Sequence, residues 1–342
     1  MYYFRADGNE NIGLGHIMRC CAVAEELVNH GKEVMFVIAP DSSDIAIKER
    51  GYKYYRLKNS SKLGWSSEEF CKWLKIQNDL SAVVVLDSYR VDYSSMKSIR
   101  EVAKLVYIDD LAMFDYPADA IINFNIEANE QMYSSTNINN RELFLGTRYF
   151  PCRSEFKKLR KNVISKKVEK ILLTCSSTDP VKAIDLLIKS INPDQYKEIE
   201  FNILVGKFFA NDYVNFLRSL SDKYSNVNLL PWGQNMAQLL YAHDLLIAPG
   251  STIMLESFII GTPCMSFYFV DNQIALCTYA NQREMAFTIG DITDPNNHKG
   301  IQELFDMELD YSSRKKQFEK FSKEFDSEGC YRIRTALERL QL

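Results

Sequence analysis

The chain lacks paired cysteine motifs, long apolar runs and closely spaced histidines. Its eight cysteines include no C-x-x-C pair, and none of its four histidines lies at a metal-ligand spacing, which argues against structural zinc. The longest apolar stretches, such as 81–86, are far too short to span a bilayer. The first residues lack the charged-then-apolar pattern of a signal sequence. We therefore expect a cytoplasmic protein with no metal and no membrane partner.

An excess of charge of one sign is also missing. The chain has 41 Lys and Arg against 45 Asp and Glu, a net charge of −4, so no basic field points to a nucleic-acid partner. Apolar residues make up 46% and charged residues 25%, as in ordinary soluble proteins. A length of 342 residues exceeds a typical single core and suits two domains. The oligomeric state stays open, with a monomer among the options.

The first half of the chain alternates apolar strands with amphipathic helices. A helix with an apolar stripe is expected at 17–30, and strands are expected at 1–6, 33–39, 82–87, 105–108 and 120–123. Continuous apolar strands separated by helices indicate a parallel sheet covered on both faces. Three of these strands end in Asp or Asn, at Asp87, at the pair Asp109-Asp110 and at Asn123. Open α/β sheets bind ligands at such carboxyl ends.

The pattern is interrupted near Pro151 and then restarts. A lysine-rich segment at 153–169 is typical of a solvated linker rather than a nucleic-acid patch. Strands are then expected at 171–174, 201–205, 227–230, 245–248 and 264–269, with helices at 180–191, 213–224, 236–243 and 253–260. We therefore predict a first Rossmann-like domain at 1–152, a basic linker at 153–169, and a second Rossmann-like domain at 170–342. The second would bind a nucleotide and include the closing helices.

A glycine-bearing loop at 7–16 follows the first strand and opens the first helix. Glycines let backbone amides approach a ligand closely, and a helix N-terminus favours negative charge. His16 lies in the first helical turn, where a neutral imidazole could act as a general base. The alternative is a structural turn whose histidine only caps or packs, and the loop alone does not separate the two.

A second such loop, 249–252, joins a strand to a helix in the second half. Its free amides, the hydroxyls of Ser251 and Thr252 and the positive helix end suit a diphosphate. Glu256 lies one turn into the helix, where its carboxylate could accept both hydroxyls of a ribose. Alternatively, Glu256 is a charge on the helix surface that interacts with the helix dipole.

These motifs together carry a resemblance to known families. The pattern Gly250-Ser251-Thr252, Glu256, Gly261-Thr262-Pro263 and Asn272-Gln273 resembles the nucleotide-binding half of the GT-B superfamily. In the first half, 13–20, 87–89, 108–112 and 145–149 are similar to the PseG-type UDP-sugar hydrolases. The resemblance covers about residues 3–282. It implies an α/β, GT-B-like fold in which two Rossmann-like domains have parallel sheets facing a cleft.

The resemblance implies hydrolysis of a UDP-linked diacetamido-trideoxy sugar, with inversion at the anomeric carbon, in nonulosonic (pseudaminic) acid biosynthesis. No cofactor is implied, and the partner is the small-molecule UDP-sugar. A carboxylate nucleophile is not required, because a water activated on the face opposite the leaving UDP inverts the anomeric carbon. The implied catalytic residues are His16 and Tyr89. The expected substrate-binding residues are Asp7, Gly13, Gly15, Arg19, Asp87, Asn272 and Gln273, and the expected nucleotide-binding residues are Gly250, Ser251, Thr252, Glu256 and Ser176.

One departure from the family pattern concerns the loop 175–180. Family members usually carry a Gly-Gly pair there, whereas this chain has Ser176 and Ser177, whose hydroxyls could contact phosphate instead. The departure leaves two alternatives to hydrolysis: an inverting GT-B glycosyltransferase with a UDP-sugar donor, and a non-catalytic protein that binds nucleotide sugars.

Overall fold

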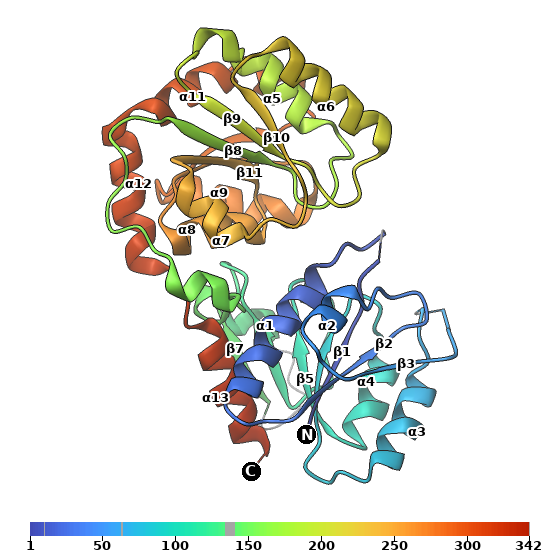
Figure 1. Cartoon of the computed structure of the whole chain (residues 1–342). Coiled ribbons are helices and arrows are strands. Elements are labelled where there is room, and N and C mark those ends of the chain that lie inside the picture. The colour runs from blue at the N-terminus through green and yellow to red at the C-terminus, as the bar shows by residue number, and fades with distance from the viewer. Residues whose placement is uncertain (10, 63, 134–140, 342) are drawn as a thin grey trace. The chain divides into compact units, whose positions relative to one another are not determined.

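The computed structural model describes residues 1–9, 11–62, 64–133 and 141–341, so Glu10 of the first glycine loop lies outside the described residues. The chain divides into two compact units (Figure 1). The first unit comprises Met1–Ser154 and Ser327–Leu342, and the second comprises Glu155–Asp326. Each unit contains one parallel sheet with helices on its faces, which confirms the predicted α/β fold class.

The first unit is built on a seven-stranded parallel sheet in the order β3-β2-β1-β4-β5-β6-β7. Its central strands are buried along their whole length, as expected for a sheet covered on both faces. The strands are β1 (Tyr2–Ala6), β2 (Val34–Ile38), β3 (Tyr54–Arg56), β4 (Val83–Asp87), β5 (Lys104–Ile108), β6 (Ala120–Asn123) and β7 (Glu142–Leu145).

Helices pack on both faces of this sheet. One face carries α1 and α13, which pack against each other, and the opposite face carries α3 and α4 (Figure 1). The helices of the first unit are α1 (Gly15–Asn29), α2 (Ile45–Glu49), α3 (Ser67–Gln77), α4 (Tyr93–Arg100) and α13 (Gly329–Gln341).

The second unit is built on a six-stranded parallel sheet in the order β10-β9-β8-β11-β12-β13. Helices α5, α6 and α11 lie on one face, and α7 and α8 lie on the other (Figure 1). The strands are β8 (Lys170–Thr174), β9 (Glu200–Leu204), β10 (Val227–Leu230), β11 (Leu245–Pro249), β12 (Cys264–Tyr268) and β13 (Phe287–Asp291). The helices are α5 (Ala183–Ile191), α6 (Asn211–Lys223), α7 (Met236–Ala242), α8 (Thr252–Ile260), α9 (Ile274–Gln282), α10 (Pro295–His298), α11 (Ile301–Leu309) and α12 (Tyr311–Glu324).

Three strands were not predicted, and all three lie at sheet edges. They are β3 and β7 in the first sheet and β13 in the second. Each contains partly exposed residues rather than a continuous buried run. An edge strand is covered less completely than a central one, so it lacks the unbroken apolar pattern that identified the others.

The last helix corrects the predicted domain boundary. Residues 170–342 were assigned to one domain, but α13 packs in the first unit. Its buried apolar face includes Ile333 and Leu337, and Arg334 lies 3.5 Å from Glu26 of α1. The amphipathic pattern of α13 identified a helix but carried no information about which sheet it would cover.

The segment 153–169 also differs from a freely solvated linker. Phe156 and Val168 are buried. The backbone amide of Lys161 donates to the carbonyl of Ile260 at 2.7 Å, and the Lys161 ammonium donates to the carbonyl of His243. The segment is therefore packed onto the second unit, although its lysines made it look solvated.

Across the described ranges, no helix combines the length and apolar character needed to cross a bilayer.

Candidate functional site

The residues expected to act on a ligand follow strands at the point where each sheet reverses its strand order. In the first unit this point lies between β1 and β4, followed by the loops 7–14 and 88–92. In the second unit it lies between β8 and β11, followed by the loops 175–182 and 250–251. In open α/β sheets, the crevice outside the carboxyl ends of the strands at such a point is where ligands bind. Each unit therefore contains one candidate site, described separately below.

In the first unit, His16 is paired with Asp87. The histidine lies in the first turn of α1, the aspartate ends β4, and Nδ1 lies 2.6 Å from Oδ1. Burial of Asp87 opposes its charged form, but the charge of Arg19 and the hydrogen bonds from Arg19 and His16 outweigh this and hold the pKa of Asp87 well below the usual range. Nδ1 also lies 2.9 Å from Arg19 Nη2, but the carboxylate contact is the shorter one. Because an ionised carboxylate only accepts hydrogen bonds, we assign the imidazole proton to Nδ1. Nε2 is then the unprotonated nitrogen, and it has no hydrogen-bond partner among the described residues.

Arg19 fixes the carboxylate of this pair. Its Nε donates to Asp87 Oδ2 at 2.6 Å, and its Nη2 donates to Oδ1 at 2.5 Å. The remaining nitrogen, Nη1, lies 3.4 Å from Asp110. Such a bidentate contact holds a carboxylate in one orientation. The structure thus gives Arg19 a role in orienting Asp87, and its expected contact with substrate stays a prediction.

Tyr89 lies beside the histidine. Its ring meets the His16 ring edge to face, with centroids 4.6 Å apart, and its hydroxyl donates to Asp110 Oδ2 at 2.6 Å. Burial and the charge of Asp110 raise the pKa of Tyr89, which keeps the hydroxyl protonated. The side chain is nevertheless 39% exposed. The protein therefore holds Tyr89 through its hydroxyl, while part of the side chain remains accessible to a ligand.

The acidic pair after β5 has two distinct roles, which the sequence analysis left open. Asp109 is buried and accepts hydrogen bonds from the Leu111 and Ala112 amides and from the hydroxyls of Tyr116 and Tyr133. It is a loop cap. Asp110 faces the site and links Tyr89 to Arg19. The sequence indicated Asp110 only through its position just after a predicted strand, and it gave no information about the hydrogen-bond partners of this carboxylate.

Three other residues of the first unit, Asp7, Gly13 and Gly15, were expected to bind substrate. Both carboxylate oxygens of the buried Asp7 are engaged, one by the Ala39 amide and one by Arg5, each at 2.7 Å. Gly13 has a φ of +71°, which favours glycine. An added Cβ at Gly15 would meet no atom within 4 Å, so the loop is open at the start of α1.

In the second unit, the N-terminus of α8 is the candidate anion site. Ser251 is its N-cap residue but makes no capping hydrogen bond, and Ser251 Oγ is buried with no partner among the residues that the structure describes. The neighbouring α5 differs, because Asp179 accepts hydrogen bonds from the Ala183 and Ile184 amides and so occupies that helix end. Between these two helices, α8 is the one whose first turn remains available to an outside anion.

Packing alone requires a glycine at position 250, and its expected contact with nucleotide stays a prediction. An added Cβ would collide with Cys277 Sγ and would lie 2.6 Å from the Gln273 carbonyl oxygen. Glu256, one turn into α8, is only 8% exposed. This burial argues against the alternative of a solvated charge on the helix surface.

The remaining expected residues surround the same sheet edge. Ser176 is exposed and has a φ of +59°, so this serine adopts the left-handed conformation that glycine adopts more easily. Gln273 is buried and accepts from the Phe269 amide at 3.0 Å, which makes it a structural residue of the turn. Asn272 is exposed in that turn and open to a ligand.

Two further residues lie after neighbouring strands of this sheet. Lys207 follows β9, Trp232 follows β10, and the lysine ammonium lies 4.8 Å from the centroid of the tryptophan ring. Trp232 is 49% exposed. A cation beside an exposed aromatic face can contact both the phosphate and the base of a nucleotide.

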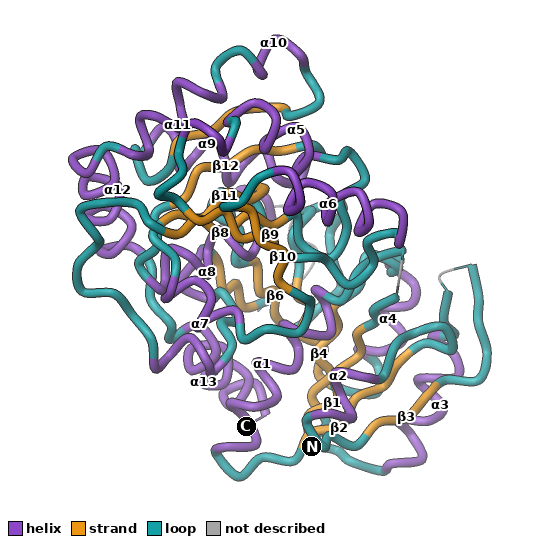
Figure 2. The backbone as a smooth tube through the Cα atoms, turned by 45° about the horizontal axis from the view of Figure 1, so that its top comes forward, coloured by secondary structure: helices purple, strands orange, loops and turns teal. Residues whose placement is uncertain are grey.

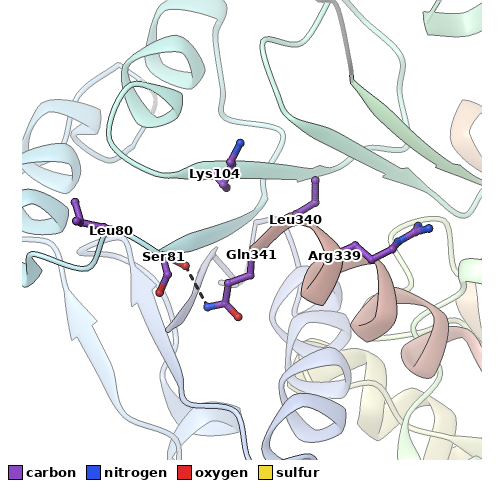
Figure 3. A pocket seen from close by; sticks show the side chains of 6 residues that line it. All are labelled: Leu80, Ser81, Lys104, Arg339, Leu340 and Gln341. Atoms are coloured by element: carbon purple, nitrogen blue, oxygen red, sulfur yellow. Dashed lines mark hydrogen bonds between the residues drawn. The ribbon is translucent and has the colours of Figure 1, made fainter.

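A pocket in the first unit lies at the opposite edge of the sheet from His16. It is formed by Leu80, Ser81, Lys104, Arg339, Leu340 and Gln341, at the start of β5 and the end of α13 (Figure 3). Gln341 donates to the Ser81 carbonyl at 3.1 Å and accepts from the Tyr2 hydroxyl at 2.8 Å. These contacts attach α13 to the sheet and indicate a structural feature. Among the residues that the structure describes, no group of three or more His, Cys, Asp and Glu side chains could hold a metal ion.

Comparison with known proteins agrees with this architecture. No family model matches the chain. An uncharacterised protein of Methanocaldococcus jannaschii is 28% identical over 280 residues, which cover 77% of this chain but only 54% of that protein. The chain therefore spans about half the length of that relative. The UDP-2,4-diacetamido-2,4,6-trideoxy-beta-L-altropyranose hydrolase of Campylobacter jejuni is 23% identical over 279 residues, covering 81% of this chain and 94% of that enzyme.

Solved structures match over nearly the whole chain. Acinetobacter baumannii MurG has a TM-score of 0.68 at 13% identity and covers 99% of both chains. Medicago truncatula UGT71G1, complexed with UDP-glucose, has a TM-score of 0.67 at 10% identity and covers 100% of this chain and 98% of its own. The chain thus has the two-domain fold of the GT-B glycosyltransferases and is similar in sequence to a UDP-sugar hydrolase.

Proposed function

We propose that this chain hydrolyses a UDP-linked diacetamido-trideoxy sugar to UDP and the free sugar, with inversion at the anomeric carbon. The second unit would bind UDP and the first unit would supply the catalytic base to the same substrate. The similarity to the Campylobacter jejuni hydrolase, which spans 94% of that enzyme, supports this substrate class. A role in nonulosonic (pseudaminic) acid biosynthesis follows from the same similarity. All eight cysteines are buried free thiols, in keeping with a cytoplasmic enzyme.

The observation that carries the proposal is the His16–Asp87 pair at the switch point of the first sheet. A base needs a free nitrogen, a fixed tautomer and a stabilised cation after it takes a proton. The contact of Nδ1 with the ionised Asp87 supplies the last two, and the unpartnered Nε2 supplies the first. In the reaction, water loses a proton to Nε2 as its oxygen bonds to the anomeric carbon. The bond from that carbon to UDP breaks, and UDP leaves with the electron pair.

The N-terminus of α8 would stabilise the leaving group. Its uncapped first turn and the Ser251 hydroxyl suit a diphosphate, and the amides would compensate the charge that grows there. Glu256 would bind the ribose. Trp232 and Lys207 lie after β10 and β9, at the same edge of the sheet.

The test is incubation of the purified chain with diacetamido-trideoxy sugars linked to UDP, CDP or GDP, with products identified by mass spectrometry. We expect free sugar and UDP from the UDP-linked substrate, and loss of both products in the His16→Ala variant. Binding of UDP-sugar without any product would instead favour the non-catalytic nucleotide-sugar-binding protein.

Glycosyl transfer is the second candidate, and one observation favours it. The loop after β5 exposes Leu111 and Met113 next to Asp110, and exposed apolar side chains can bind an apolar acceptor. A transferase would give little free sugar in buffer and a glycosylated product once an acceptor is added. Rapid release of free sugar without any acceptor would exclude this candidate.

A further inference from the structure

The loop that joins β3 to α3, residues 57–66, contains Trp65, which contacts the loop that carries Tyr89. Apart from residue 63, which lies outside the described residues, this loop is drawn in teal between β3 and α3 in Figure 2. Trp65 is fully buried, and its indole Nε1 donates to the carbonyl oxygen of Arg90 at 2.9 Å. Arg90 directly follows Tyr89 in the chain. The tryptophan therefore contacts the backbone one residue away from the tyrosine of the candidate site.

Trp65 itself is held on several sides. The Arg5 guanidinium lies 4.4 Å from the centroid of its ring, and Arg5 is buried and paired with Asp7. Phe70 meets the ring edge to face at 6.2 Å, and Ser61 donates to the Trp65 carbonyl at 2.5 Å. Because these contacts fix the ring, the direction of its N–H is fixed as well. The indole can thus act as a rigid support for the Arg90 carbonyl.

The loop 88–90 is held at two points, one on each side of Tyr89. On one side, the Tyr107 hydroxyl donates to the Ser88 carbonyl at 3.1 Å. On the other side, Trp65 binds the Arg90 carbonyl, and the Arg90 side chain covers Gly64 so closely that an added Cβ would collide with its guanidinium. Tyr89 lies between these two points, so its backbone position depends on both.

We propose that Trp65 is a positioning residue for Tyr89. Its hydrogen bond to Arg90 holds the tyrosine so that the hydroxyl reaches Asp110 and the ring contacts His16. Loss of the indole N–H would leave the Arg90 carbonyl without that donor, and the loop would shift to satisfy it. The effect on turnover rests on the proposed function, whereas the effect on the site geometry does not.

The matched pair of variants is Trp65→Phe and Trp73→Phe. Trp65→Phe keeps an aromatic ring against Arg5 but removes the N–H. Trp73 is buried in the same hydrophobic core and stacks on Tyr55 at 5.2 Å, while its indole nitrogen has no acceptor among the described residues. Trp73→Phe therefore controls for the general effect of shrinking a core tryptophan.

The first measurement is the proton NMR signal of His16 Hε1, which the Tyr89 ring shields or deshields according to its position. The chain has four histidines, so each signal is assigned by His→Gln replacement. We expect Trp65→Phe to move the His16 signal in the same direction as Tyr89→Leu, and Trp73→Phe to leave it in place. Gly64→Ala serves if Trp65→Phe does not fold. Its methyl group would collide with the Arg90 guanidinium, and alanine disfavours the φ of +80°, so the same loop contact is disturbed while Trp65 is intact and the His16 signal should move.

The second measurement is release of UDP from UDP-2,4-diacetamido-2,4,6-trideoxy-β-L-altropyranose. Misplacement of a positioned group by about 1 Å can cost on the order of a hundredfold, so we expect Trp65→Phe to lower kcat about ten- to a hundredfold with little change in KM. In the Tyr89→Leu background, which lacks both the hydroxyl and the ring, the further loss from Trp65→Phe should disappear.

The outcomes separate this inference from the proposed function. An unmoved His16 signal in both Trp65→Phe and Gly64→Ala would overturn the positioning role, as would an equal loss of kcat from Trp65→Phe in the wild-type and Tyr89→Leu backgrounds. If the wild-type chain releases no UDP from this substrate, the proposed function fails, and the NMR measurement alone decides the role of Trp65.

Discussion

At the scale of single residues, the candidate site of the first unit consists of side chains that fix one another. Arg19 orients Asp87, Asp87 sets the tautomer of His16, and Asp110 joins Arg19 to Tyr89. Within this set, Nε2 of His16 has no hydrogen-bond partner among the described residues, and Tyr89 is 39% exposed. We therefore expect these two groups to act on a ligand.

Replacement of His16 tests this division of roles. General-base catalysis typically contributes 10²–10⁴-fold, so we expect His16→Ala to lower turnover of the UDP-sugar by about two to four orders of magnitude. UDP affinity measured by calorimetry should be nearly unchanged, because the proposed nucleotide site lies in the second unit. The control is His30→Ala, since His30 is the residue after the same helix and its Nδ1 contacts the carbonyl and the carboxylate of Glu26. A His16→Ala enzyme retaining more than about a tenth of the normal rate would show that His16 is not the base.

At the scale of elements, packing explains features whose sequence pattern suggested ligand binding. The glycine at 250 resembles a phosphate-loop glycine, but it lies where α9 approaches the end of β11 too closely for a side chain. Conversely, α5 begins three residues later than predicted because Asp179 caps its first amides and Lys182 has a φ of +54°. The same short segments therefore contain both residues whose pattern suits ligand binding and residues that helix packing or capping requires.

Gly250→Ala should destabilise the protein even without ligand. The new methyl group would collide with Cys277 Sγ and the Gln273 carbonyl, and overpacking of this kind costs about 1–3 kcal/mol of unfolding free energy. Gly15→Ala is the matched control, because no atom lies within 4 Å of its added Cβ. Urea denaturation of both variants makes the comparison. Equal stability of Gly250→Ala and wild type would mean that α9 moves aside freely.

The contact between α11 and α12 should make stability depend on pH. Burial raises the pKa of Glu308 to about 8, although Gln317 and the Phe287 amide donate to its Oε1. Because the folded protein holds this proton more tightly than the unfolded chain, the stabilisation is complete below the ordinary Glu pKa and is lost as pH rises toward 8. One proton gives a slope of at most about 1.4 kcal/mol per pH unit.

We therefore expect the free energy of unfolding to fall less between pH 5 and pH 8 in Glu308→Gln than in wild type. The control is Glu303→Gln, an exposed position on the same helix. Urea midpoints at several pH values provide the measurement, and parallel curves for Glu308→Gln and wild type would contradict the expectation.

At the scale of the whole molecule, the predictable part of the structure is the part set by local pattern. The central strands, such as Val83–Asp87, are continuous apolar runs, and the loop before His16 was recognisable from its glycines. Contacts between distant positions were not predictable from one sequence. Asp87 meets His16 across 71 residues of sequence, and α13 belongs to the first unit although it follows the whole second unit in the chain. Arg19 illustrates the difference: its motif predicted substrate binding, which stays a prediction, whereas its bidentate contact with Asp87 could not be predicted from the sequence.

The central claim is that water, activated by His16, attacks the anomeric carbon of a UDP-sugar. Turnover of UDP-2,4-diacetamido-2,4,6-trideoxy-β-L-altropyranose in oxygen-18 water, followed by mass spectrometry of both products, tests it most directly. The account predicts one labelled oxygen in the sugar and none in UDP, with proton NMR showing the inverted anomer before mutarotation. Label in UDP would mean attack at phosphorus, and retention of configuration would mean a covalent intermediate; either result would contradict the account.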